Sequence, residues 1–170
     1  MQLVELDPLT EPYWDELVAG EQEPFGGIGE QLSWREKTRN IGLRDERGQL
    51  LAAGGVVLAE LRAAAGPPFQ VAGLGGLIVK ASARRHGLAR SLAGPLLDAA
   101  RELQVERAML FCMARLMPFY EELGFRQVLA PVWADQPGGR IEMPLEAMWK
   151  PLREGVGWPG GELQLDGEPF

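Results

Sequence analysis

The stretch that decides the fold is residues 77–97, LIVKASARRHGLARSLAGPLL. Its first residues form a β-branched and apolar run, and from Leu88 onward leucines recur at helical spacing, so the stretch predicts a strand, a turn and a helix. Its four bases are Lys80, Arg84, Arg85 and Arg90, and it contains no acid. The first N–H groups of a helix lack partners inside the helix and attract anions. The sequence therefore predicts a phosphate-binding turn.

Residue types in the turn support this interpretation. Gly87 permits a positive φ and a close approach, Ala89 is small, and arginines bind phosphate in fork geometry. The alternative is an ordinary strand-to-helix turn that happens to be basic. The glycine spacing alone is weak support, because the Rossmann and Walker fingerprints require further glycines or a Gly-Lys-Ser/Thr.

Composition limits the function classes. The 170 residues suit one domain, with 46% hydrophobic and 24% charged residues in the ordinary globular range. A net charge of −7 opposes binding to a nucleic-acid backbone. A single cysteine excludes an internal disulfide, and no apolar run approaches the ~18 residues of a membrane span. We expect a cytoplasmic protein that binds neither nucleic acid nor membrane.

Strand and helix patterns alternate around this stretch. Strands are expected at residues 2–6, 41–44, 49–61, 69–80, 108–113, 125–132 and 140–148. Helices are expected from an N-cap at Thr10 to Gly20, as a turn or two over residues 32–38, and over residues 88–104 and 116–123. Pro95 predicts a kink near Gly94, and the glycines at 73, 75 and 76 predict a bulge or a close approach within their strand.

Two motifs are similar to those of a known family. Residues 77–89, LIVKASARRHGLA, resemble the acyl-CoA-binding motif of the GNAT superfamily of N-acyltransferases, and residues 119–125, FYEELGF, resemble that family's Tyr-Glu-x-x-Gly-Phe helix end. The resemblance implies an α+β GNAT fold, in which a mixed, mostly antiparallel central sheet of about six or seven strands is flanked by about four helices. We expect this domain to span residues 1–150, and the apolar tail of residues 151–170 to pack on it.

The resemblance also implies the chemistry. An amine attacks the thioester of acetyl-CoA directly in a ternary complex, without a covalent enzyme intermediate or a metal. The implied cofactor-binding residues are Leu77, Ile78, Val79, Arg84, Arg85, His86, Gly87, Leu88, Ala89 and Arg90: the first three hold the pantetheine arm and polarise the thioester oxygen, and the others surround the diphosphate. The glycines of residues 73–76 make room for the arm. Tyr120 would protonate the departing thiolate; its alternative role is a core aromatic beside Phe119.

Two departures from the family pattern affect the mechanism. The strand of residues 69–79 contains no acid where relatives often carry a glutamate base. The base stays open among Glu21, Glu23, Asp135, Glu142 and a terminal carboxylate on Phe170, or a neutral amine needs none. Met113 also replaces the usual asparagine. We interpret His86 as part of the loop rather than as a base, and Cys112 as buried and inert.

The acceptor is the least determined part of the function. Residues 1–30 contain eight acids and no Lys or Arg, which would suit a small cationic amine, or would simply form a solvated acidic surface. A weak similarity to aminoglycoside 2'-N-acetyltransferases and nodulation N-acyltransferases points the same way. Trp14, Phe25 and Trp34 could line the acceptor site or belong to the core. The other hypothesis is a catalytically weak CoA-binding module with a regulatory or partner-binding use, and a homodimer is possible in either case.

Overall fold

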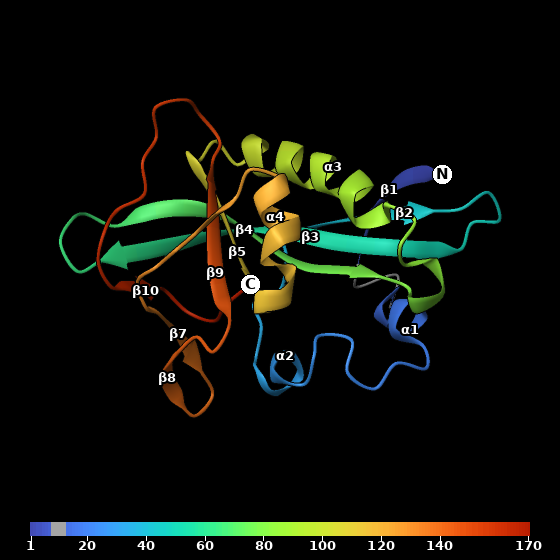
Figure 1. The fold of residues 1–170 in the computed structure, drawn as a ribbon, viewed down its shortest axis with the longest axis horizontal. Helices are drawn as coiled ribbons and strands as arrows, with labels where there is room; N and C mark the ends of the chain where they lie inside the picture. The colour runs from blue at the N-terminus through green and yellow to red at the C-terminus, as the bar shows by residue number, and fades with distance from the viewer. Residues whose placement is uncertain (8–12) are drawn as a thin grey trace.

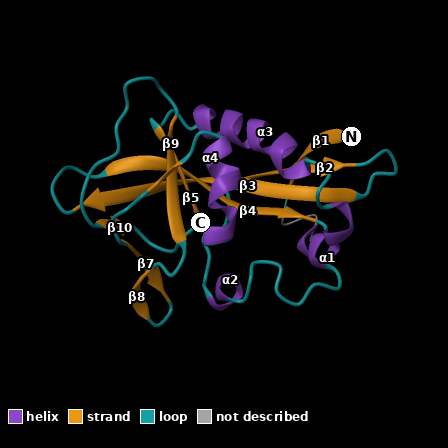
Figure 2. Ribbon diagram, viewed as in Figure 1, coloured by secondary structure: helices purple, strands orange, loops and turns teal. Residues whose placement is uncertain are grey.

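The computed structural model describes residues 1–7 and 13–170, which fold around one mixed sheet (Figures 1 and 2). Its ten strands in the described residues are β1 (Gln2–Leu6), β2 (Arg39–Arg44), β3 (Leu50–Ala63), β4 (Phe69–Val79), β5 (Arg107–Cys112), β6 (Arg126–Gln127), β7 (Val132–Gln136), β8 (Gly139–Glu142), β9 (Glu146–Pro151) and β10 (Leu163–Leu165). The α-helices are α1 (Tyr13–Val18), α2 (Ile28–Gln31), α3 (Leu88–Glu102) and α4 (Met117–Glu122).

The sheet is organised around the long strand β3. The strand order is β6-β9-β5-β4-β3-β10-β7-β8, and β2 pairs with both β1 and β3. β4 lies antiparallel along one edge of β3, while β2 and β10 pair with different parts of its other edge. β4 and β5 are parallel, with α3 as the crossover between them, as expected for a parallel pair.

Strand β4 changes partners halfway along its length. Its pairing with β5 covers only Ala72–Leu74, and no further ladder pair joins the two strands. Between Gly55 and Ala53 of β3 the register with β4 shifts by one residue, and Gly76 takes a φ of 62° there. This is the bulge predicted from the glycines, because one extra β4 residue fits only where a left-handed conformation is allowed.

Helices cover both faces of the sheet. Leu92 and Leu96 of the amphipathic α3 are buried in a cluster that includes Ala52 of β3, whereas the neighbouring Ala53 belongs to a cluster with Leu17 of α1. Successive strand residues point to opposite faces, so α3 and α1 lie on opposite sides. The sheet is therefore buried from both sides near the bulge.

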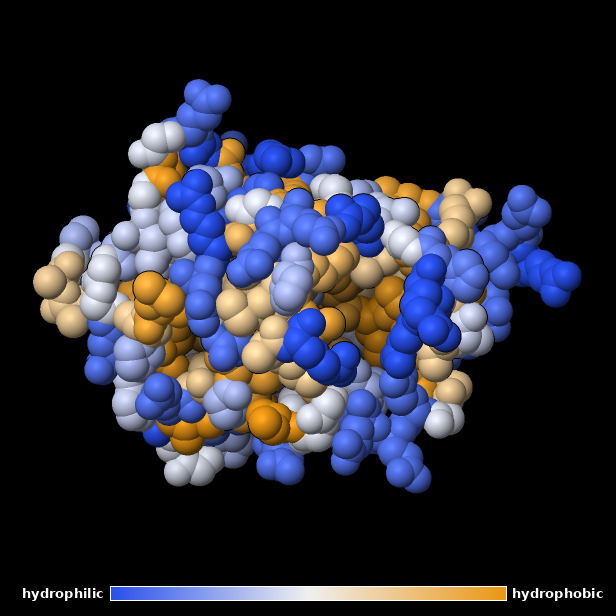
Figure 3. Space-filling model, in the orientation of Figure 1, coloured by the Kyte–Doolittle hydropathy of each residue, from blue (hydrophilic) through white to orange (hydrophobic). Residues whose placement is uncertain are grey.

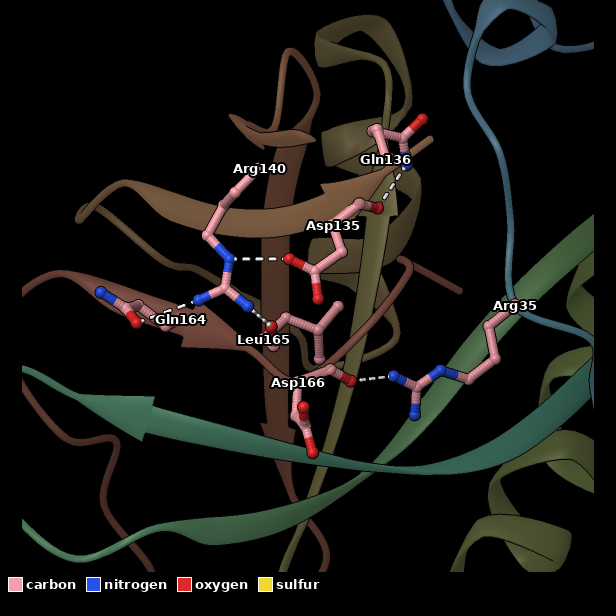
Figure 4. A network of polar contacts seen from close by, with 7 residues as sticks. All are labelled: Arg35, Asp135, Gln136, Arg140, Gln164, Leu165 and Asp166. Atoms are coloured by element: carbon pink, nitrogen blue, oxygen red, sulfur yellow. Dashed lines mark hydrogen bonds and ion pairs between the residues drawn. The ribbon is translucent and has the colours of Figure 1, made fainter. Parts of the chain in front are cut away.

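The last residues of the chain are built into the sheet. β10 lies between β3 and β7, and Figure 4 shows how Arg140 fastens it, with hydrogen bonds to Asp135 (2.8 Å), Gln164 (3.0 Å) and the Leu165 carbonyl (3.4 Å). Arg35 donates to the Asp166 carbonyl in the same network. Residues 163–170 are thus held by side chains from two distant parts of the chain, the β7–β8 hairpin and the segment that contains Arg35.

This segment ends with a buried aromatic ring. The Phe170 side chain is 1% exposed and lies 5.3 Å from the ring of Phe111, centroid to centroid. A Cβ on Gly73 would approach its ring within 2.4 Å, so Gly73 provides the space for Phe170. The ring covers the β4–β5 pair on the face opposite α3.

We expect Phe170→Ala to lower the free energy of unfolding by about 3–5 kcal/mol, because it removes a buried ring that Gly73 cannot replace. Urea unfolding followed by circular dichroism measures the change. Leu129→Ala is the control: Leu129 is 88% exposed, so its loss should change stability by no more than about 0.5 kcal/mol. Equal midpoints for the two variants would contradict the structural role of the ring.

Several expectations about the elements are confirmed and others are wrong. The strand at residues 2–6, the hairpin of β2 and β3, and the helices ending near residues 18, 102 and 122 are found as predicted. The strand count is higher than expected, because residues 125–151 form four strands: β7 and β8 form a hairpin, while β9 pairs with β5 and β6. Residues 32–38 are not helical, and α2 precedes them.

The remaining expectations have mixed outcomes. Thr10 lies outside the described residues. Helix α3 continues unbroken through Pro95. The division of the chain at residue 150 stays a prediction. In the described part of the chain, no helix has the length and apolar character needed to span a membrane.

Candidate functional site

The basic turn has the geometry of an anion site. Gly87 precedes α3 with a φ of 76°, and no atom lies within 4 Å of where its side chain would be. The first helical hydrogen bond runs from the Ser91 amide to the Gly87 carbonyl (3.0 Å), so the N–H groups of residues 88–90 have no helical partner. The first turn contains no acid. An anion placed against Gly87 would meet free amides and the positive end of a 15-residue helix.

The arginines of the turn differ in their contacts. Arg84 donates to the Val79 carbonyl (3.0 Å) and pairs with Glu21 (2.5 Å), so it ties the turn to the segment after α1. Arg90 pairs with Glu122 of α4. Arg85, with a φ of 66°, is exposed, and its guanidinium has no hydrogen-bond or ion-pair partner among the described residues. Charge at the turn is therefore partly neutralised, and Arg85 is the side chain best placed to meet an anion.

The other predicted residues of the turn divide into exposed and buried ones. His86 is exposed, with Nδ1 3.3 Å from the Ala83 carbonyl, in agreement with a loop residue. Leu88 is buried in the α3 core cluster, so only its main chain can contribute to an anion site, and Ala89 is half-buried.

The second half of β4 presents an open edge toward this turn. Leu77 and Val79 pack on the α3 side, whereas Ile78 is buried on the α1 side. Because β5 no longer pairs with β4 beyond Leu74, main-chain groups of residues 75–79 are available to an extended ligand, which could add to the edge like a strand. Figure 3 shows a hollow with a hydrophobic floor here, between α4 and α1 and below α3.

Two further surface pockets lie away from the open edge of β4. One is bordered by residues 127–132 and 142–147, and the other lies between β1 and α3. Neither contains a residue of the basic turn. Neither pocket therefore combines the basic turn with an open strand edge, and the site considered for an extended anionic ligand is the edge of β4 next to the start of α3.

Tyr120 lies near the C-terminal end of β5. Its ring packs edge-on against Phe119 (5.0 Å) and Phe125 (5.9 Å), and it belongs to the α3-side cluster that also contains Leu77. Burial, and secondly the neighbouring Cys112, raise the pKa of the Tyr120 hydroxyl above its ordinary value. Such a group stays protonated at neutral pH, which is the state that a proton donor needs.

Cys112 itself is buried, and burial raises the pKa of its thiol to about 11. Its thiolate is therefore scarce at neutral pH, as expected for an inert cysteine.

The α1 side of the bulge is covered by aromatic residues and by the α1–α2 segment. A Cβ on Gly76 would approach the Trp14 ring within 2.9 Å, and Trp14 meets Phe25 edge-on at 6.0 Å. A Cβ on Gly26 would approach the Met113 sulfur within 2.3 Å. Met113, which was expected to replace the family's asparagine, thus supports the α1–α2 segment.

Trp34, the third aromatic expected at this site, donates its indole N–H to the Gly29 carbonyl (2.7 Å). The bond fastens the segment that follows α2 to the helix itself. Trp34 also packs against the cluster that contains Phe170. These contacts indicate that Trp34 packs over the core, which is the alternative to lining the acceptor site.

The candidate bases differ in their ion pairs, their exposure and their position relative to β4. Glu21 is committed to Arg84, and the Arg140 hydrogen bond lowers the pKa of Asp135. Glu23 and Glu142 are exposed. Phe170 is the candidate that the structure places against β4, since its carbonyl carbon would lie 2.5 Å from a Cβ on Gly75. The identity of the base stays a prediction.

Sequence reasoning missed two residues at this site, Lys37 and the ring of Phe170. Gly73 and Gly75 were expected to make room for the pantetheine arm, but the space beside them is filled by Phe170 and by the Lys37 side chain. The only signal in the sequence was the run of glycines, which indicates a close approach without naming the partner.

Acetyl-CoA fits the residues of the turn and of β4. Its diphosphate would meet the free amides after Gly87 and the exposed Arg85, and its pantetheine arm would lie along the open edge of β4. A Cβ at residue 87 would point into the open space that the diphosphate needs. The residues present therefore suit a nucleotide-linked thioester.

Comparisons with known proteins agree with this geometry. The model of the family described as acetyltransferase (GNAT) family matches residues 6–125. No curated protein matches the chain. The fold resembles that of the Escherichia coli GNAT family N-acetyltransferase YhbS in complex with CoA, with a TM-score of 0.64, 18% identity, and coverage of 97% of this chain and 89% of that one.

Two further solved structures share the fold. Chaetomium thermophilum Naa20 in complex with a bisubstrate analogue has a TM-score of 0.60 and 18% identity over 96% of this chain and 97% of that one. The Escherichia coli ribosomal-protein-S18-alanine N-acetyltransferase has a TM-score of 0.56 and 20% identity over 92% and 99%. The chain is accordingly an acyltransferase that uses acetyl-CoA, and it belongs to the acetyltransferase (GNAT) family.

Proposed function

We propose that the enzyme transfers an acetyl group from acetyl-CoA to a primary amine of a small cationic molecule, by direct attack in a ternary complex. The observation that supports this most is the open edge of β4, which leads into the acid-free N-terminus of α3. One extended ligand could occupy both features, with its diphosphate at Gly87 and its thioester near the bulge at Gly76. Holding both reactants there would remove much of the entropic barrier.

In this proposal main-chain groups of residues 77–79 hold the pantetheine arm and polarise the thioester oxygen. Arg85 contacts the diphosphate. Arg84 and Arg90 also contact it once they exchange their carboxylate partners, Glu21 and Glu122, for phosphate oxygens. Tyr120 donates a proton to the thiolate as the C–S bond breaks, and the raised pKa of its hydroxyl supports that role.

The acceptor class is supported by charge around the α1–α2 segment. Several described acids of residues 1–30 have structural partners: Glu5 pairs with Arg39, Glu21 pairs with Arg84, and Glu16 and Glu30 accept main-chain N–H groups. Glu23 and Asp15 are exposed. The Glu23 carboxylate lies beside Gly27, and the preceding residue, Gly26, packs against Met113. We call the exposed carboxylates of Asp15 and Glu23 the acidic rim, and a cationic amine would be attracted to it. The proposal includes a cytoplasmic location; a homodimer stays a prediction.

An amine screen with detection of released thiol tests the proposal. We expect turnover with a polyamine, at a kcat/KM on the order of tenfold above that of a monoamine of equal chain length, because negative charge on the rim attracts the second ammonium. The advantage should shrink as salt is raised from ~10 mM to ~1 M, since exposed charges are then screened. Aminoglycosides and a peptide with an N-terminal alanine complete the panel.

The outcomes separate the candidate functions. Equal rates for charged and uncharged amines, or a clear preference for the peptide, would overturn the small cationic acceptor while keeping acetyl transfer. Binding of acetyl-CoA without turnover across the whole panel would favour the CoA-binding module.

A further inference from the structure

Lys37 reaches the candidate site from a segment that the proposed mechanism does not use. Gly55 of β3 and Gly75 of β4 are paired residues, and neither has a side chain. A Cβ on Gly55 would lie 2.6 Å from the Lys37 Cβ and 2.5 Å from its Cγ, and a Cβ on Gly75 would lie 2.6 Å from its Cε. The lysine stem therefore lies in a groove made by two paired glycines.

This groove directs the lysine toward the bulge. Gly75 is next to Gly76, the residue of the bulge. From there to residue 79, β4 has no pairing with β5, so its main chain is available to the thioester arm. On this face, the Phe170 carbonyl carbon also approaches Gly75, and the Trp14 ring approaches Gly76. The end of the Lys37 side chain thus lies on the α1 side of the bulge, where the proposed function places the acceptor amine.

Hydrogen bonds hold the lysine in this position. Its Nζ donates to the Arg35 carbonyl (2.8 Å), and the Arg35 amide donates to the Pro169 carbonyl (2.7 Å). Arg35 also donates through its guanidinium to the Asp166 and Leu58 carbonyls. The segment that carries Lys37 is therefore fastened to residues 163–170, whose own anchors are shown in Figure 4.

The environment favours the neutral amine. Burial, and secondly the charge of Arg35, lower the pKa of Lys37 to about 8. The two strands beneath the stem contribute glycines, and the final segment contributes the main chain of Phe170, which is one of the candidate bases named above. Near pH 8 about half of such amines carry a free lone pair, against fewer than about one in a hundred for an ordinary lysine.

We propose that Lys37 is a site of self-acylation, where the enzyme transfers the acetyl group of its own bound acetyl-CoA to the Lys37 amine. The Nζ lone pair attacks the thioester carbonyl carbon, the C–N bond forms and the C–S bond breaks. The coenzyme leaves as a thiol after taking up one proton, and the nitrogen loses one proton on becoming an amide. No further reactant is required.

Mass spectrometry of the full chain incubated with acetyl-CoA, without any acceptor amine, tests this inference. The chain has three lysines, Lys37, Lys80 and Lys150, so the modified residue can be identified unambiguously by peptide mapping. We expect a gain of about 42 Da, one acetyl group, at Lys37. Lys37→Arg should abolish the gain, and Lys80→Arg and Lys150→Arg should retain it.

Two controls distinguish self-transfer from chemical acetylation. Protein unfolded in urea should lose the preference for Lys37, and the Gly87→Glu variant should lose the modification together with the cofactor. Lys37→Arg keeps the charge and most of the stem, and its circular dichroism spectrum reports whether it folds. Absence of the mass gain, or similar gains at all three lysines, overturns the inference.

The inference rests on the acetyl-CoA site of the proposed function, but the two can fail separately. Turnover in the amine screen without modification of Lys37 overturns self-acylation alone. Modification of Lys37 without turnover of any free amine supports self-acylation and counts against the proposed acceptor. Absence of acetyl-CoA binding overturns both.

Discussion

Tyr120→Phe is expected to reduce kcat by about 10²- to 10⁴-fold while leaving the KM for acetyl-CoA nearly unchanged. The substitution keeps the ring, with its contacts to Phe119 and Phe125, and removes only the hydroxyl. Without a donor the thiolate leaves unprotonated, and the barrier to C–S cleavage rises. Because the pKa of the hydroxyl is raised, the wild-type rate should not decline between pH 7 and pH 9 through loss of this proton.

Tyr13→Phe is the matched control. The chain has two tyrosines, and burial likewise raises the pKa of Tyr13, to about 12. Tyr13 lies in α1 rather than beside β5, so its hydroxyl should not affect kcat. Steady-state rates of thiol release for both variants decide the question. If Tyr120→Phe retained a rate within a few fold of the wild type, Tyr120 would be a core aromatic and the proton donor would lie elsewhere.

Gly87→Glu is expected to weaken acetyl-CoA binding by about 30-fold to 700-fold. A side chain at a φ of 76° is strained, and the carboxylate would enter the space where the diphosphate is proposed to bind. Repulsion between charges about 4 Å apart at an intermediate dielectric is worth up to about 4 kcal/mol, so a loss of about 2–4 kcal/mol of binding free energy is reasonable. Isothermal titration calorimetry with CoA measures the affinity.

Gly48→Glu provides a control with the same strain and the same charge. Gly48 has a φ of 79°, has no atom within 4 Å of its missing side chain, and lies in the turn between β2 and β3. Its affinity for CoA should match the wild type. Gly87→Ala separates strain from charge, and we expect it to lose much less affinity than Gly87→Glu. Similar affinities for Gly87→Glu and Gly48→Glu would show that the basic turn does not hold the diphosphate.

Much of the fold was predictable because it depends on local signals. Leucines at helical spacing predict α3, and Gly124, with a φ of 86°, follows the expected helix at its C-terminal end. The glycine run in residues 73–76 predicted the bulge correctly. These features follow from conformational preferences of neighbouring residues, which a single sequence contains.

Other elements could not be predicted, because they depend on contacts between residues far apart in the chain. A helical turn or two was expected over residues 32–38, but the segment has no regular secondary structure. Its Trp34 and Lys37 side chains pack against distant residues instead. Residues 125–132 suggested one strand, yet only Arg126 and Gln127 pair with β9 before the chain turns toward β7. Pairing partners far away in the chain decide such cases.

The same division applies to the candidate site. From its own residues the sequence determined a strand, a basic turn and a helix whose first amides are free, because each requires only contiguous residues. The tertiary structure alone decided that β4 separates from β5 after Leu74, that the Phe170 ring fills the space beside Gly73, and that Lys37 crosses Gly55 and Gly75. Each of these contacts joins residues distant in the chain, and a missing side chain leaves a space whose occupant is decided only when the whole chain folds.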